Sequence, residues 1–138
     1  MAGVDLPDRR GRWILLLDLL LVIVFALSGR ASHTETLDPV GLLGTAWPFL
    51  AGCVVGHLVV RAWRRPTALW PTGVVIWIVT VAGGMGLRAL TDAGTALSFV
   101  LVATGVLGLF LLLPRLIVSL WRRGANRAAA GRRSGPAR

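Results

Sequence analysis

The sequence predicts an all-α transmembrane protein, a four-helix bundle with both termini in the cytoplasm. Four long apolar segments alternate with short polar ones, and the arginines lie almost entirely on one side of that alternation. Each apolar segment is long enough to cross a bilayer as a helix, which takes about 17–25 residues. We expect a basic N-terminus over residues 1–12, a transmembrane domain over 13–121 with spans at about 13–30, 39–62, 71–90 and 93–120, and a basic, disordered cytoplasmic tail over 122–138.

Proline and aspartate place the ends of the later helices, whereas the first span is simply an apolar run that follows a basic segment. Asp38 followed by Pro39 is typical of a helix start, because Asp accepts from an unpaired amide and proline lacks the amide that would be orphaned there. Pro71 is expected to open the third span, and Asp92 to cap the fourth. Pro48 falls inside the second span, where losing one backbone hydrogen bond predicts a kink.

The arginines predict the orientation, because short cytoplasmic loops carry the excess of basic residues. One side of the alternation holds Arg9, Arg10, Arg12, Arg61, Arg64, Arg65, Arg122, Arg123, Arg127, Arg132, Arg133 and Arg138. The connections on the other side hold only Arg30 and Arg88. We therefore expect a multi-pass protein of the plasma (inner) membrane with both ends inside. In an alternative interpretation the first segment is a cleaved signal peptide, although Asp18 weakens its apolar run.

Composition narrows the classes of function. Hydrophobic residues make up 55% of the 138 residues, which excludes an ordinary soluble domain and a disordered chain. The net charge of +9 is explained by arginines that flank spans, so we expect no nucleic-acid partner. The sequence shows no nucleophile and base set, cofactor motif or phosphate-binding loop, so we expect neither an enzyme nor a cofactor. Cys53 is the only cysteine, and we expect no metal.

Three ionisable residues inside the spans form the first candidate site. Counted from the basic ends of their helices, Asp18, His57 and Arg115 fall at a similar depth in the cytoplasmic half. Ionisable groups within a span are costly and usually face a partner or water. Two interpretations stay open. In the structural one, either Asp18 pairs with Arg115 to offset burial, or Arg115 and His57 reach the headgroups. In the other, the cluster forms a proton or ion path.

A second candidate site lies on the outer face. Arg30, His33 and Arg88 are expected near one another there, where two arginines can grip an anion. In the alternative interpretation Asp38 and Asp92 cap helices, and Arg30 and Arg88 lie at phosphates or carboxylates.

Small residues in the second span predict close helix packing. Gly52 and Gly56 form a GxxxG pattern, which lets another backbone approach closely, near the expected kink at Pro48. The partner is either a neighbouring helix of the same chain or a second copy in a homo-oligomer. Beyond the bilayer itself, a membrane-protein partner is a further candidate, and the Arg-rich tail is expected either to bind anionic lipid headgroups or only to set topology.

Several short patterns together resemble a known family of small four-helix prokaryotic membrane proteins, classified as a domain of unknown function. They are Asp18, Gly29-Arg30, Ser32-His33, Thr45-Ala46-Trp47-Pro48-Phe49, Gly52, Gly56, Gly83-Gly84-Met85, Leu87-Arg88 and Phe99. The resemblance runs from about Asp18 to Arg115 and implies a four-helix membrane protein, with no activity, substrate or cofactor attached.

Two classes of function therefore remain. The first is a structural, interaction or accessory membrane protein. The second is a small oligomeric transporter or channel with a proton or ion path at Asp18, His57 and Arg115. The accessibility of Asp18 separates them, because an accessory protein keeps it dry and paired whereas a transporter exposes it to water.

Overall fold

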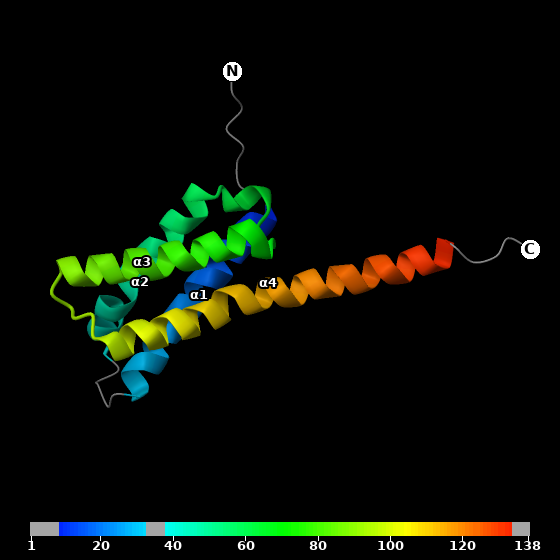
Figure 1. Cartoon of the computed structure of the whole chain (residues 1–138). Helices are drawn as coiled ribbons and strands as arrows, with labels where there is room; N and C mark the ends of the chain where they lie inside the picture. The colour runs from blue at the N-terminus through cyan, green and yellow to red at the C-terminus, as the bar shows by residue number, and fades with distance from the viewer. Residues whose placement is uncertain (1–8, 33–37, 134–138) are drawn as a thin grey trace, which may run out of the picture.

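The computed structural model describes residues 9–32 and 38–133, which form four long helices joined by short connections (Figure 1). They are α1 (Arg9–Ser32), α2 (Pro39–Val59), α3 (Val74–Leu90) and α4 (Leu97–Arg133), with the short helical turns η1 (Ala62–Arg64) and η2 (Leu69–Gly73) between α2 and α3. All four are long and apolar enough to cross a membrane. The all-α class and the presence of four helices able to span a membrane are therefore confirmed.

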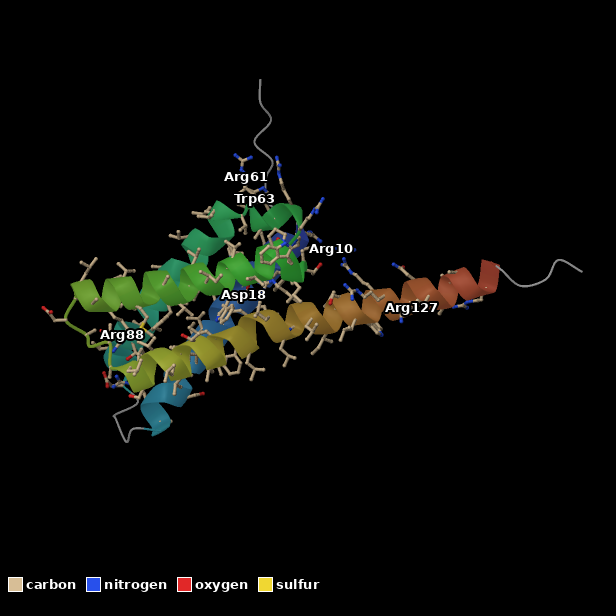
Figure 2. The ribbon with its side chains drawn as sticks, in the orientation of Figure 1. Arg10, Asp18, Arg61, Trp63, Arg88 and Arg127 are labelled. Atoms are coloured by element: carbon tan, nitrogen blue, oxygen red, sulfur yellow. The ribbon has the colours of Figure 1, made fainter. Side chains whose placement is uncertain are left out.

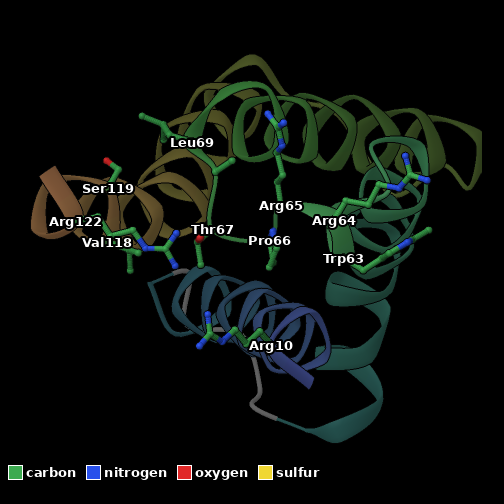
Figure 3. Close-up of a pocket in the computed structure, with 11 residues that line it drawn as sticks. Arg10, Trp63, Arg64, Arg65, Pro66, Thr67, Leu69, Val118, Ser119 and Arg122 are labelled. Carbon is green, nitrogen blue, oxygen red and sulfur yellow. The ribbon is translucent and has the colours of Figure 1, made fainter. Parts of the chain in front are cut away.

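The helices form a closed ring in which each contacts two neighbours, in the order α1, α2, α3, α4 and back to α1. The view along the bundle in Figure 3 shows this arrangement. One end, which we call the arginine end, brings together Arg10, the connection around Arg64 and Arg65, and Arg122. The opposite end brings Arg30 close to Arg88. The arginine-rich segments, which alternate with the other connections along the sequence, therefore lie together at one end of the bundle.

The tightest contact joins α2 and α3 through the predicted glycine pair. A Cβ added to Gly52 would lie 2.9 Å from the carbonyl oxygen of Thr80, and one added to Gly56 would lie 3.0 Å from the Cα of Ile76. The GxxxG pattern therefore packs within this chain, as small residues do between membrane helices. Pro48 is buried nearby, and α2 continues through it from Pro39 to Val59.

Helix ends agree with the sequence at α2 and differ at α4. Asp38 caps α2 as predicted, and its Oδ2 accepts a 2.7 Å hydrogen bond from the amide of Gly41. The prediction that Asp92 caps the fourth helix is wrong. Asp92 has a φ of 53° and Gly94 one of 81°, so the chain turns there and α4 begins only at Leu97.

The C-terminal ends of α2 and α4 also differ from the predicted ones. The second helix ends at Val59 rather than near residue 62, because Arg61 takes a left-handed conformation with a φ of 47°. The fourth helix continues to Arg133, where the sequence predicted disorder from residue 122. Alanine and arginine favour helix, and extending an existing helix needs no new nucleation.

The interior has two layers along the bundle axis. The aromatic layer consists of Phe25 of α1, Phe49 of α2 and Phe99 of α4, with ring centroids 5.3–6.3 Å apart. Arg88 of α3 places its guanidinium carbon 4.4 Å from the Phe99 centroid and closes the ring of contacts on that side. The second layer, nearer the arginine end, is polar and contains the first candidate site.

Candidate functional site

Asp18 and Arg115 form a two-pronged ion pair in the middle of the bundle. Arg115 Nη1 donates to Asp18 Oδ1 at 3.0 Å, and Nη2 donates to Oδ2 at 2.6 Å. Asp18 is 1% exposed and Arg115 2% exposed. Figure 2 shows Asp18 inside the bundle, away from the arginines at the surface. Such parallel hydrogen bonds satisfy both carboxylate oxygens, which a buried charge needs.

The surrounding backbone gives Arg115 its position. Its Nη1 also donates at 2.7 Å to the carbonyl oxygen of Leu111, one turn earlier in α4. Gly73, at the start of the third span, leaves room for the side chain, since a Cβ there would lie 2.7 Å from Arg115 Cδ. Arg115 Nε is buried without a hydrogen-bond partner among the described residues. Gly73 is not predictable from the sequence as part of the site, because only the packing of η2 against α4 reveals its role.

His57 of α2 completes the polar layer. Its Nε2 lies 3.1 Å from Asp18 Oδ2, and its Nδ1 lies 3.0 Å from the carbonyl oxygen of Cys53. Nε2 is not aligned for a hydrogen bond within the described part of the chain. A carbonyl only accepts, so Nδ1 donates to Cys53 and a neutral ring turns its Nε2 lone pair toward the carboxylate. His57 thus links the backbone of α2 to the buried carboxylate of Asp18.

The structure thus brings together the three residues that the sequence placed at one depth. They come from α1, α2 and α4, and two of the three pairs lie within contact distance. We call Asp18, His57 and Arg115 the polar triad. The geometry favours the interpretation in which Asp18 pairs with Arg115 to offset burial, because Arg115 donates to both oxygens of Asp18.

Cys53 adds a ligand type that the sequence spacing did not assign to this site. Asp18, Cys53 and His57 each offer one ligand atom, and these atoms lie within 4.8 Å of one another. The set does not fit a cation well, because Arg115 donates to both oxygens of Asp18 and places a positive charge beside them.

The second candidate site is only partly described. Arg30 and Arg88 line one cavity of about 280 Å³ at the opposite end, while His33 lies outside the described residues. Arg30 pairs with Asp38 at 3.4 Å. Arg88 donates to the carbonyl of Gly94 at 3.1 Å and to that of Ala93. Both arginines therefore stabilise the connections next to their helices, and anion binding there stays a prediction.

Comparison with known proteins yields one match. Residues 15–118 match a family described as a protein of unknown function, DUF3054. No curated protein and no solved structure matches the chain. The matched region contains all three residues of the polar triad and overlaps all four candidate spans, and it confirms the resemblance drawn from the sequence. Because the match covers most of its length, this chain belongs to the DUF3054 family of proteins of unknown function.

Proposed function

We propose that this chain is an interaction or accessory subunit of the plasma membrane, with both ends in the cytoplasm. One observation carries the proposal: Asp18 is 1% exposed, and both of its oxygens accept from Arg115. An ion or proton carrier needs an ionisable group that exchanges with water. Asp18 is shielded from water and accepts two hydrogen bonds from Arg115. This supports a role for the triad in determining which helices pack against one another.

The charge distribution supports the proposed orientation. Arginines from three separate segments lie at the arginine end, which the positive-inside rule assigns to the cytoplasm. Trp13, Trp70 and Trp121 are strongly exposed, and their helices carry them at that same end. Indole rings prefer the headgroup region, so their exposure to lipid headgroups fits this placement.

The part of α4 beyond the bundle is our candidate partner surface. Figure 1 shows α4 projecting well past the other three helices. The residues of this projection, from Trp121 to Arg132, are all exposed. Gly52 and Gly56 are already covered by α3, so a partner has to use another surface. A partner with acidic groups complements the arginines of this projection.

Labelling of Cys53 in native membranes tests the dry interior. We expect a small water-soluble maleimide to leave Cys53 unmodified, because its side chain is fully buried. As a matched control, the double variant Cys53→Ser/Ala128→Cys should label rapidly, since residue 128 is exposed on α4. Rapid labelling of Cys53 in the natural protein would overturn the accessory proposal in favour of an aqueous path.

The orientation has its own test in the same Cys53→Ser background. A membrane-impermeant maleimide added to intact cells should modify Ala93→Cys, in the turn at the opposite end, and spare Ala128→Cys. Both positions are exposed, so accessibility within the protein does not separate them. The reverse pattern would invert the proposed topology.

A proton path is the second candidate function, and one observation favours it. A cavity of about 80 Å³ borders Asp18 and Arg115, and its lining residues Thr67 and Val118 also line the large pocket at the arginine end. The two cavities describe a route to Asp18 from one face only. In vesicles loaded with a pH-sensitive dye, the purified protein would then carry protons and Asp18→Asn would not. We expect no flux from either protein.

A further inference from the structure

The arginine end contains a pocket to which neither candidate function assigns a bound ligand. Its volume is about 500 Å³, within the range of small-molecule sites. It lies between the start of α1, the connection from η1 to η2, and α4 near residue 120 (Figure 3). Its lining side chains are Arg10, Trp63, Arg64, Arg65, Thr67 and Arg122, with Ser119 among the others.

The lining has the chemistry of a phosphate site. Among the described residues, it includes four arginines and two hydroxyl-bearing residues, and no residue with a carboxylate side chain. Guanidinium forks donate in parallel to phosphate oxygens, and serine and threonine hydroxyls add further donors. Figure 3 shows Arg10 on α1 and Arg122 on α4 on either side of the opening, with Thr67 between them. An anion there is held from two helices at once.

The height of the pocket in the membrane suggests where such an anion comes from. Trp63 lines the pocket, and Trp13, Trp70 and Trp121 are exposed from the helices and connection around it. Indole rings of membrane proteins gather at the headgroup level. Basic pockets between membrane helices on the cytoplasmic side are suited to anionic headgroups. The phosphate of a lipid therefore lies at the depth of this pocket.

We propose that this pocket binds a phosphate-bearing anion through Arg10 and Arg122, as an anionic lipid headgroup or a soluble phosphate ester. The proposal is independent of the accessory role and of the proton path. It differs from general attraction of the basic tail to lipid, because it assigns binding to arginines that face one cavity rather than to every arginine of α4.

The test compares two double variants with the same loss of charge. Arg10→Gln/Arg122→Gln removes pocket arginines, while Arg123→Gln/Arg127→Gln removes two exposed arginines of α4 that do not line the pocket. Each full-length protein is reconstituted in nanodiscs of phosphatidylcholine, with or without phosphatidylglycerol, and then released from them. Native mass spectrometry then measures how much phosphatidylglycerol stays bound. Equal thermal unfolding midpoints of the two variants show that folding is intact.

We expect the pocket variant to bind phosphatidylglycerol about 100-fold more weakly than the natural protein, since it loses two charge-assisted contacts to the phosphate, each worth about tenfold in affinity. The control variant should bind it nearly as well as the natural protein. A second arm adds glycerol phosphate to protein in phosphatidylcholine alone. Saturable binding there that requires Arg10 and Arg122, with no retention of phosphatidylglycerol, supports the site and identifies a soluble ligand as its occupant.

Two results would overturn the proposal. If both double variants lose lipid equally, binding belongs to the basic surface of α4 as a whole and the pocket has no special role. If neither phosphatidylglycerol nor glycerol phosphate binds in a way that depends on Arg10 and Arg122, the cavity is not a phosphate site.

Discussion

The two layers of the bundle interior solve the same packing problem with different chemistry. The aromatic layer joins three helices by ring contacts at 5.3–6.3 Å, which depend on shape. The polar triad joins three helices through Asp18, whose partners lie at 2.6–3.1 Å and depend on charge. In lipid, helices gain little from burying apolar surface, so shape alone discriminates weakly between alternative pairings. A buried charge with one correct partner discriminates strongly.

The comparison predicts that single substitutions are far more costly in the polar layer. Arg115→Met should lower the free energy of unfolding by about 3–5 kcal/mol, because the buried Asp18 loses the cation that donates to both of its oxygens. Titration with SDS in detergent micelles measures this change. The double variant Asp18→Leu/Arg115→Met should regain most of the loss, since an apolar pair replaces the ion pair. A fully stable Arg115→Met protein would show that Asp18 is not dry.

The aromatic layer has a tight contact of its own, at Gly84 of α3. A Cβ there would overlap the ring of Phe49, so Gly84→Ala should cost about 1–3 kcal/mol through overpacking. Gly86→Ala is the matched control on the same helix, because a Cβ there meets no described atom within 4 Å. The same SDS titration compares the two. Equal stability would mean that Phe49 moves aside freely and that shape matters less than we infer.

Removing one ring tests the aromatic layer directly. Phe49→Leu loses the ring contacts with Phe25 and Phe99, and we expect a cost of about 1–2 kcal/mol from two aromatic pairs. If the layers are independent, combining it with Asp18→Leu/Arg115→Met should give additive effects within about 0.5 kcal/mol. Strong coupling in unfolding measurements would argue that the interior is one network rather than two layers.

The smallest expected effect concerns a hydrogen bond between α3 and α4. Trp77 Nε1 donates to the carbonyl oxygen of Thr104 at 3.0 Å. Trp77→Phe should cost about 0.6 kcal/mol, the usual value for hydrogen bonds between membrane helices. Trp47→Phe is the control, because Trp47 is 41% exposed on α2 and should tolerate the change. A loss larger than that of Phe49→Leu would contradict the ranking.

The sequence was sufficient to predict what depends on position along one helix. Hydropathy predicts four spans, and counting residues from the basic helix ends places Asp18, His57 and Arg115 at one depth, where the structure also has them. Asp38 and Pro39 mark a helix start through local chemistry alone. These features need no knowledge of which helices are neighbours.

Features that depend on neighbouring helices were not predictable in this way. Gly73 makes room for Arg115 only because η2 lies against α4. Arg10 and Arg122 are 112 positions apart, and nothing in the sequence places them together, yet they line one cavity. Asp92 looked like a cap, but the turn it occupies is shaped partly by Arg88, which donates to the carbonyl of Gly94.

The length of α4 gives the protein a fixed reach. Its 37 residues make a rod of about 55 Å, whereas the hydrocarbon core that it crosses is only about 30 Å thick. In the proposed orientation, roughly 25 Å of stiff helix then stands off the cytoplasmic surface. Anything bound near Arg132 is held at a set height above the bilayer, so the helix acts as a spacer whose length, rather than its composition, sets which complexes it can meet.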